Sequence, residues 1–150
     1  MKTTPPAARL LGFAGLLPQA ACLVAAFAGP PEWRWSALAI GWAYAALILS
    51  FLGGAWWGLA SGSPDGGRNA PAWLWISAVL PSLLALLTFL PWVFGAIWPG
   101  PSLFVLGGAL VLSVLVDARL VTVRPSWWMR LRTPLSLGLG IATILLGFAA

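Results

Sequence analysis

Histidine is absent from this sequence, and cysteine and charged side chains are close to absent. The 150 residues include no histidine, one cysteine and only 7% aspartate, glutamate, lysine and arginine. Without histidine the chain lacks the commonest general base, metal ligand and axial haem ligand. The single cysteine, Cys22, forms neither an internal disulfide nor a thiolate metal cluster. We therefore predict no metal site, no cofactor and no enzymatic activity; catalysis would have to depend on Asp117, Tyr44 or a bound cofactor.

The scarcity of charge also excludes a water-soluble globular domain. Soluble domains carry charged residues at about a quarter of their positions, whereas 61% of this chain is apolar and its mean hydropathy is +0.95. The net charge of +5 comes from eight basic residues that are scattered between apolar segments and form no patch for nucleic acid. The lipid bilayer must therefore be the main partner of the surface.

Five apolar segments are long enough to cross a membrane, and together they make residues 1–150 a single multi-span domain. The first extends roughly 28 Å as a helix, close to the thickness of the hydrocarbon core. No segment alternates with a period of two, so we expect an all-α bundle rather than a barrel. Residues 92–98 either extend the third span or lie in the membrane interface. The predicted spans are residues 10–28, 36–60, 72–90, 102–120 and 133–148.

The basic residues predict how the chain is threaded. Arg34 falls alone on one side of these spans, and the other basic residues fall on the side of the N-terminus. Cytoplasmic loops carry the excess of lysine and arginine, so we expect a cytoplasmic N-terminus and a C-terminus outside. The first span is long for a signal peptide and is interrupted by Pro18, so we expect it to be retained. The residues on the N-terminal side are Lys2, Arg9, Arg68, Arg119, Arg124, Arg130 and Arg132.

The segment ILSFLGGAWWGLASG (residues 48–62) places glycines and tryptophans together at the end of an apolar run. On a helix, Ser50, Gly54 and Gly58 fall on one side, and Gly53 lies next to them. Small residues four positions apart let two membrane helices approach closely. We predict that these four residues form a helix-packing face that another helix of the same chain fills. A homodimer contact, or a groove for a lipid or flat ligand, is the alternative.

Two sets of polar and aromatic residues are candidates for a binding site. The first would line a groove within the membrane and comprises Gln19, Trp42, Tyr44, Trp56 and Trp57. The second would contact lipid headgroups, because arginine binds phosphate with paired hydrogen bonds, and comprises Asp117, Arg119, Arg124, Arg130 and Arg132. In the alternative interpretation Asp117 pairs with a neighbouring arginine, the other arginines anchor the chain, and Gln19 bonds to backbone freed by Pro18.

Four stretches of the sequence resemble a known family of membrane proteins. They are LGFAGLLP (residues 11–18), YAALILSFLGGAWWG (44–58), AVLPSLLALL (78–87) and PSWWMRLRTPLSL (125–137). They look like the family named after transmembrane protein 69, also called domain of unknown function 3429, and ILSFLGG-x-x-WG is the most specific element. The resemblance covers nearly the whole chain. It implies a small multi-span protein, here expected in the bacterial inner (plasma) membrane, and it brings no activity or ligand to carry over.

Two functions remain as hypotheses. No ionisable residue is expected at mid-membrane and the spans show no repeated halves, which disfavours a coupled transporter. We expect a non-catalytic accessory, assembly or interaction component that contacts other membrane proteins or forms a homo-oligomer. The alternative is a membrane-embedded protein that binds a lipid, a quinone or a tetrapyrrole-like molecule in the groove described above.

Overall fold

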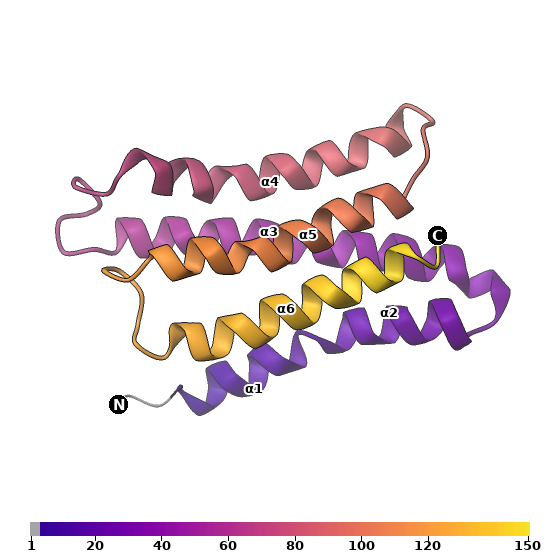
Figure 1. Cartoon of the computed structure of the whole chain (residues 1–150), viewed down its shortest axis with the longest axis horizontal. Helices are drawn as coiled ribbons and strands as arrows, with labels where there is room; N and C mark the ends of the chain where they lie inside the picture. The colour runs from indigo at the N-terminus through magenta and orange to yellow at the C-terminus, as the bar shows by residue number, and fades with distance from the viewer. Residues whose placement is uncertain (1–3) are drawn as a thin grey trace.

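The computed structural model describes residues 4–150, and all regular structure within that range is helical. The helices lie side by side as an up-and-down bundle, with α1 and the C-terminus at opposite ends (Figure 1). The all-α architecture expected from the sequence is confirmed. The elements are α1 (Pro6–Ala14), α2 (Leu17–Ala28), the short 3-10 helix η1 (Pro31–Trp33), α3 (Arg34–Ser61), α4 (Ala72–Val93), α5 (Gly100–Arg119) and α6 (Trp128–Gly147).

The first span consists of two helices, α1 and α2, with a break around Gly15. Pro18 lies in the first turn of α2 and has no N–H to donate to the carbonyl one turn earlier, so the helix is interrupted there. At the break, the Gly15 N–H donates to the carbonyls of both Leu11 and Gly12, at 3.0 and 3.1 Å. The Tyr44 hydroxyl of α3 donates to the Gly15 carbonyl at 2.5 Å. This bond holds the break against the rest of the bundle.

α3 lies at the centre of the bundle and contacts α2, α4, α5 and α6. Its 28 residues extend roughly 42 Å at about 1.5 Å per residue, which exceeds the ~30 Å hydrocarbon core. Because it contacts these four helices, α3 supplies the surface against which the other spans pack. The main apolar core includes Leu49 and Leu52 of α3 together with Leu106 and Leu110 of α5.

Several helix boundaries differ from those expected from the sequence, and the differences at the end of α4 and the start of α6 change the connections. α4 continues to Val93, and Gly95, with φ of +68°, then turns the chain toward α5. Of residues 92–98, only the first two thus extend the third span. α6 begins at Trp128 rather than at residue 133, so that Pro134 lies inside the helix. Proline removes one helical hydrogen bond, but α5 and α6 form the most extensive helix pair in the bundle, and this packing keeps α6 continuous.

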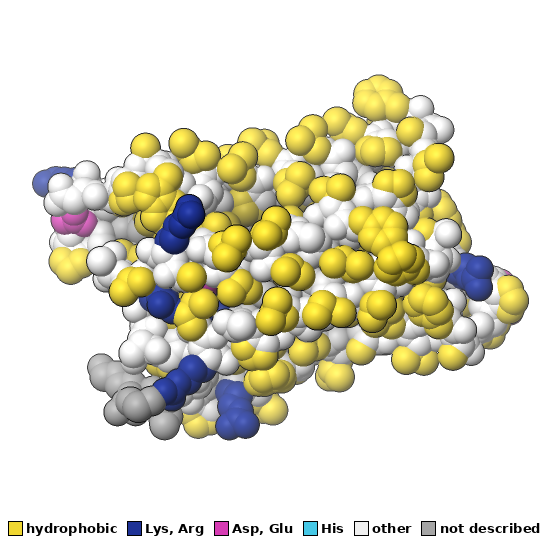
Figure 2. Space-filling model, in the orientation of Figure 1, with side chains coloured by type: hydrophobic (Ala, Val, Ile, Leu, Met, Phe, Trp, Pro, Cys, Tyr) yellow, Lys and Arg dark blue, Asp and Glu magenta, His cyan; other side chains and the backbone are white. Residues whose placement is uncertain are grey.

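The outer surface is apolar over the middle of the bundle (Figure 2). Large side chains such as Leu47, Phe51 and Leu86 are more than half exposed, as expected where lipid replaces water. Within residues 4–150, five helical segments are long and apolar enough to cross a membrane. Basic side chains gather toward the end formed by α1 and the α3–α4 and α5–α6 connections (Figure 2), while Arg34 begins α3 at the other end. Lys2 lies outside the described residues.

Candidate functional site

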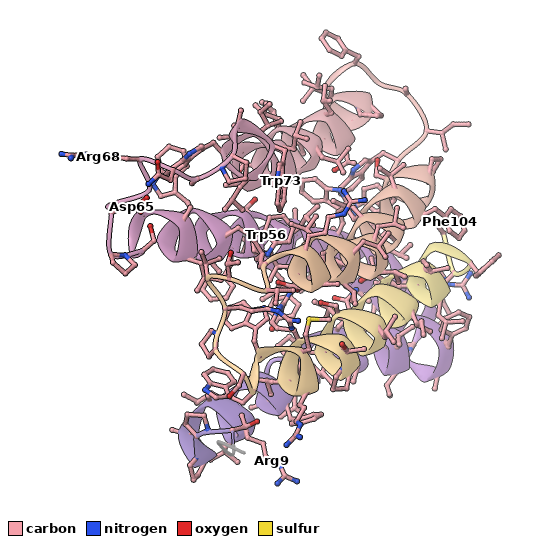
Figure 3. The ribbon with its side chains drawn as sticks, turned by 60° about the vertical axis from the view of Figure 1, so that its left-hand side comes forward. Arg9, Trp56, Asp65, Arg68, Trp73 and Phe104 are labelled. Atoms are coloured by element: carbon pink, nitrogen blue, oxygen red, sulfur yellow. The ribbon has the colours of Figure 1, made fainter. Side chains whose placement is uncertain are left out.

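The last turn of α5 holds a carboxylate that is completely buried. Asp117 has an exposed fraction of 0%. Its Oδ1 atom accepts hydrogen bonds from the indole N–H groups of Trp56 and Trp128, at 2.9 and 2.8 Å. Its Oδ2 atom accepts one from Arg132 Nε at 3.1 Å. The carboxylate therefore joins α3, α5 and α6, and Figure 3 shows Trp56 inside the bundle among these helices.

Arg132 extends the hydrogen bonds further along α6. Its Nη2 group donates to Ser136 Oγ at 3.0 Å. Ser136 Oγ lies 3.2 Å from Ser113 Oγ of α5, whose one hydrogen donates to the Leu110 carbonyl at 2.6 Å, so the Ser136 hydroxyl donates to Ser113. Trp128, Arg132 and Ser136 are four residues apart and so lie on one face of α6, as Ser113 and Asp117 do on α5. We call these side chains the polar cluster, which consists of Trp56, Ser113, Asp117, Trp128, Arg132 and Ser136.

The polar cluster satisfies the charges that it buries. A buried ion costs several kcal/mol unless it is paired and hydrogen-bonded. Here the Asp117–Arg132 pair has additional donors on the carboxylate, and the Arg132 guanidinium lies over the Trp128 ring at 6.0 Å from its centroid. The pairing of Asp117 with a neighbouring arginine, one of the two interpretations of the sequence, is present in the structure. Both side chains point inward rather than toward headgroups.

An apolar cavity of about 390 Å³ adjoins the polar cluster. It lies between α1, α3, α5 and α6, and we call it the Arg132 cavity. Arg132 is the one charged residue in its lining, and Ser136 lies next to it. The remaining walls are almost entirely apolar and include Leu11, Leu16, Ile48, Phe51, Leu135 and Leu139. The cavity is therefore amphiphilic, with hydrogen-bond donors on one side and hydrocarbon on the others.

The other hollows differ in chemistry. A cavity of about 450 Å³ between α3, α4 and α5, which we call the α4 cavity, has Ala109 in its lining together with Trp56 and Ser113 of the polar cluster, and no charged residue. A hollow of about 550 Å³ around Arg34 and Trp98 lies at the opposite end of the bundle from the polar cluster. Within residues 4–150, no group of three or more histidine, cysteine, aspartate or glutamate side chains is placed to hold a metal ion.

The five residues proposed as a groove do not come together. The Trp42 indole donates to Thr88 Oγ1 at 3.2 Å, and Gln19 Nε2 donates to Thr143 Oγ1 at 3.0 Å, so that each joins a different pair of helices. Trp57 is 49% exposed and packs edge-on against Trp75. Tyr44 bonds to the break in the first span and Trp56 to Asp117, as described above. Gln19 thus bonds across helices rather than to the backbone near Pro18.

The helix-packing face divides between two sides of α3. Gly53 faces α4, and a Cβ atom there would collide with the Ala78 carbonyl. Gly54 and Gly58 face outward, and a Cβ atom at either would meet no atom within 4 Å in the described part of the chain. The expected intrachain contact is therefore absent at these two glycines, and it is made at Gly53. A contact of Gly54 and Gly58 with another protein stays a prediction.

The headgroup candidates also separate. Asp117 and Arg132 are inside the bundle, whereas Arg119 and Arg130 are exposed and Arg124 is half-buried. Of these, Arg119 lines a small hollow together with Asp65 of the α3–α4 connection. Contacts of the three outer arginines with lipid headgroups stay a prediction.

Sequence reasoning missed half of the polar cluster. It placed Asp117 and Arg132 in one candidate set and Trp56 in the other, and it did not include Ser113, Trp128 or Ser136 in either. The four-residue spacing of 113 and 117, and of 128, 132 and 136, is the signal that places these polar groups on two facing helix sides.

Comparison with known proteins identifies relatives along nearly the whole chain. A family described as "Protein of unknown function (DUF3429)" matches residues 4–148. Transmembrane protein 69 of Xenopus tropicalis is 34% identical over 140 residues, which are 91% of this chain and 51% of that protein. The chain thus spans about half the length of this curated relative. No solved structure matches it.

Proposed function

This chain belongs to the DUF3429 family of proteins of unknown function, and from that premise we propose that it binds an amphiphilic small molecule or lipid in the Arg132 cavity. It is a multi-span membrane protein. We propose that its membrane is the bacterial inner membrane, with α1 beginning on the cytoplasmic side. The excess of arginine at that end of the bundle supports this orientation.

The main support for the binding function is that the Asp117–Arg132 ion pair lies beside the apolar Arg132 cavity. Ligand sites are concave, mostly apolar and carry a few placed polar groups, in volumes of roughly 300–1,000 Å³. The Arg132 cavity has these properties, with about 390 Å³ of space and one arginine in an otherwise apolar lining. An ion pair that only stabilised the bundle would need no adjoining space. The arrangement favours binding without catalysis, since no nucleophile paired with a base lines the cavity.

A pair of matched substitutions tests the binding function. Ala55 of α3 lines the Arg132 cavity and Ala109 of α5 lines the α4 cavity, and both are half-buried. Ala55→Phe should fill the first cavity and Ala109→Phe the second, with the same change of side chain. We expect protein purified in mild detergent to lose a co-purifying amphiphile in Ala55→Phe and to keep it in Ala109→Phe, as measured by mass spectrometry of extracted lipids. Equal retention in both variants would contradict binding in the Arg132 cavity.

A second candidate function, as an accessory or assembly component, is supported by the outward side of α3. Gly54 and Gly58 leave open space there, which gives another membrane helix a surface for close approach. Gly54→Leu should preserve the fold and weaken association with a partner span or a second copy. Gly108→Leu on α5, where a Cβ atom also meets open space, is the control. Unchanged association of the Gly54 variant in crosslinking and native mass spectrometry would reject this candidate.

A further inference from the structure

The polar cluster presents the remaining N–H groups of Arg132 to a molecule in the Arg132 cavity. Asp117 accepts at both oxygens and is fully buried. The one hydrogen of the Ser113 hydroxyl donates to the Leu110 carbonyl at 2.6 Å, so the Ser136 hydroxyl, which accepts from Arg132, donates to Ser113 Oγ at 3.2 Å. Arg132 carries five N–H groups, and within residues 4–150 its hydrogen bonds use Nε and one N–H of Nη2. Its side chain is 12% exposed and lines the cavity.

The polar end of the cavity carries no net charge. Arg132 and Asp117 neutralise each other at 3.1 Å, and no other charged residue lines the cavity. An anion placed there would lose its hydration without meeting an uncompensated positive charge. A cation would meet donors instead of acceptors. Arg9 and Arg130 line a separate hollow, which shares Leu131 with the Arg132 cavity.

On the basis of the binding function proposed above, we infer that the ligand is an uncharged amphiphile with a carbonyl-type acceptor at one end. The carbonyl oxygen accepts from the remaining N–H groups of Arg132, and the hydrocarbon body lies along Leu16, Phe51 and Leu135. Two membrane components have this chemistry, namely the ring carbonyl of a quinone and the ester carbonyl of an acylglycerol. A fatty acid anion and a phosphate-headed lipid carry charge at the polar end and are disfavoured for that reason.

The test is a competition assay on the full chain in nanodiscs of diether phosphatidylcholine, a lipid that has no ester carbonyl. The probe is tritiated 2-dodecanone, and its competitors at equal bilayer mole fraction are dodecane, dodecyl phosphate and dodecyltrimethylammonium. We expect unlabelled 2-dodecanone to compete about tenfold better than dodecane. The ketone can accept a hydrogen bond from the charged Arg132 and the alkane cannot, and one or two such bonds account for a difference of this size. Both charged competitors should be no better than dodecane. Stronger competition by dodecyl phosphate than by the ketone, or equal competition by ketone and dodecane, would overturn the inference.

Two further competitors distinguish the sources of the carbonyl. A decyl-benzoquinone and a monoacylglycerol with a twelve-carbon chain are added under the same conditions. Competition by either one at least as strong as that of the ketone supports the inference, and the stronger of the two identifies the source. Failure of both overturns it.

Asp117→Asn tests the charge balance directly. The variant leaves the Arg132 charge uncompensated, so dodecyl phosphate should gain about tenfold relative to the ketone when compared with wild type. An unchanged ranking in folded Asp117→Asn protein would contradict the inference. The wild-type ranking needs no variant and decides the question if Asp117→Asn does not fold.

The two proposals fail in different ways. Ketone binding that persists in Ala55→Phe would overturn the proposed function, because the ligand would then lie elsewhere. Binding that is lost in Ala55→Phe but is strongest for dodecyl phosphate would overturn only the inference about the ligand.

Discussion

Trp56 and Trp57 are neighbours in the sequence with opposite environments in the structure. Trp56 is 3% exposed and donates to the buried carboxylate of Asp117, whereas Trp57 is 49% exposed at the lipid-facing surface. Both lie where an interfacial tryptophan is expected. Only the structure shows that Trp56 belongs to the polar cluster. Matched substitutions of the two tryptophans therefore test whether the hydrogen bond of Trp56 stabilises the cluster.

We predict that Trp56→Phe lowers the free energy of unfolding by about 1.5–3 kcal/mol, because a hydrogen bond to a charged group is lost. Trp57→Phe should change it by no more than about 0.5 kcal/mol, as is usual for surface positions. Both values are measured by reversible denaturation in mixed micelles. Similar values for the two variants would show that the indole N–H of Trp56 does not stabilise the cluster.

Asp65, in the connection between α3 and α4, gives a prediction on pH (Figure 3). Its carboxylate accepts from Ser63 Oγ at 2.6 Å and from the backbone N–H groups of Asn69 and Gly67. These bonds, with that of Ser63 the largest effect, lower the pKa of Asp65 below its ordinary value of 3.8. The carboxylate therefore stabilises the loop above the ordinary value, and this contribution is lost as the pH falls through the lowered pKa.

Ser63→Ala should raise the pKa of Asp65 toward its ordinary value, so that the loop loosens at a higher pH. The control is Ser61→Ala, because the Ser61 hydroxyl bonds to carbonyls of its own helix. Carbon-13 NMR of the Asp65 carboxyl group follows the titration. The same midpoint in the Ser63 variant as in wild type would contradict the prediction.

At the residue scale, the sequence indicates which side chains need a hydrogen-bond or ion-pair partner better than it indicates which residues supply that partner. The charges of Asp117 and a nearby arginine indicate an ion pair, because an aspartate near a span end needs a counterion. The donation by Trp56 was not predictable, since α3 and α5 are separated by another helix and their relative rotation depends on packing. The Arg132 cavity was not predictable for the same reason.

At the scale of helices, α5 and α6 approach each other closely through a glycine on each helix. A Cβ atom at Gly107 would lie 2.8 Å from the Gly140 carbonyl oxygen, and one at Gly140 would lie 2.8 Å from that of Gly107. The two backbones are therefore in reciprocal contact. The next residue, Gly108, faces open space.

Gly107→Ala should destabilise the bundle by about 1–3 kcal/mol, the usual effect of overpacking, because α5 and α6 must separate. Gly108→Ala should be neutral or slightly stabilising, since alanine favours the helix more than glycine does. Thermal unfolding in detergent compares the two variants. A stable Gly107 variant would reject the close contact.

The five spans, and the proline that interrupts the first, follow from hydropathy and from the missing N–H of Pro18. Hydropathy does not show in the same way which face of each helix packs against another helix. Successive helical residues differ in direction by about 100°, so Gly53 meets α4 while Gly54 faces outward. An apolar side chain is suitable both where a helix faces lipid and where it faces another helix. The sequence therefore lacks the contrast between polar and apolar faces that marks the buried side of a helix in a soluble protein.

At the scale of the whole molecule, the distribution of arginine predicts the orientation. A reporter that is active only outside the inner membrane should be active when fused after Ala150 and inactive when inserted in the α3–α4 connection. The physical reason is that basic loops are retained on the cytoplasmic side. The opposite pattern of reporter activity would reverse the threading and place the polar cluster near the outer leaflet.

The most direct test of the central claim is a density map of the full chain in nanodiscs made with native lipid. We expect elongated density in the Arg132 cavity, with one end within hydrogen-bond distance of the Arg132 guanidinium and the body beside Phe51. The α4 cavity, which lacks a charged residue, should show no ordered polar end. A map in which α1 closes onto α3 and side chains fill the Arg132 cavity would contradict the claim.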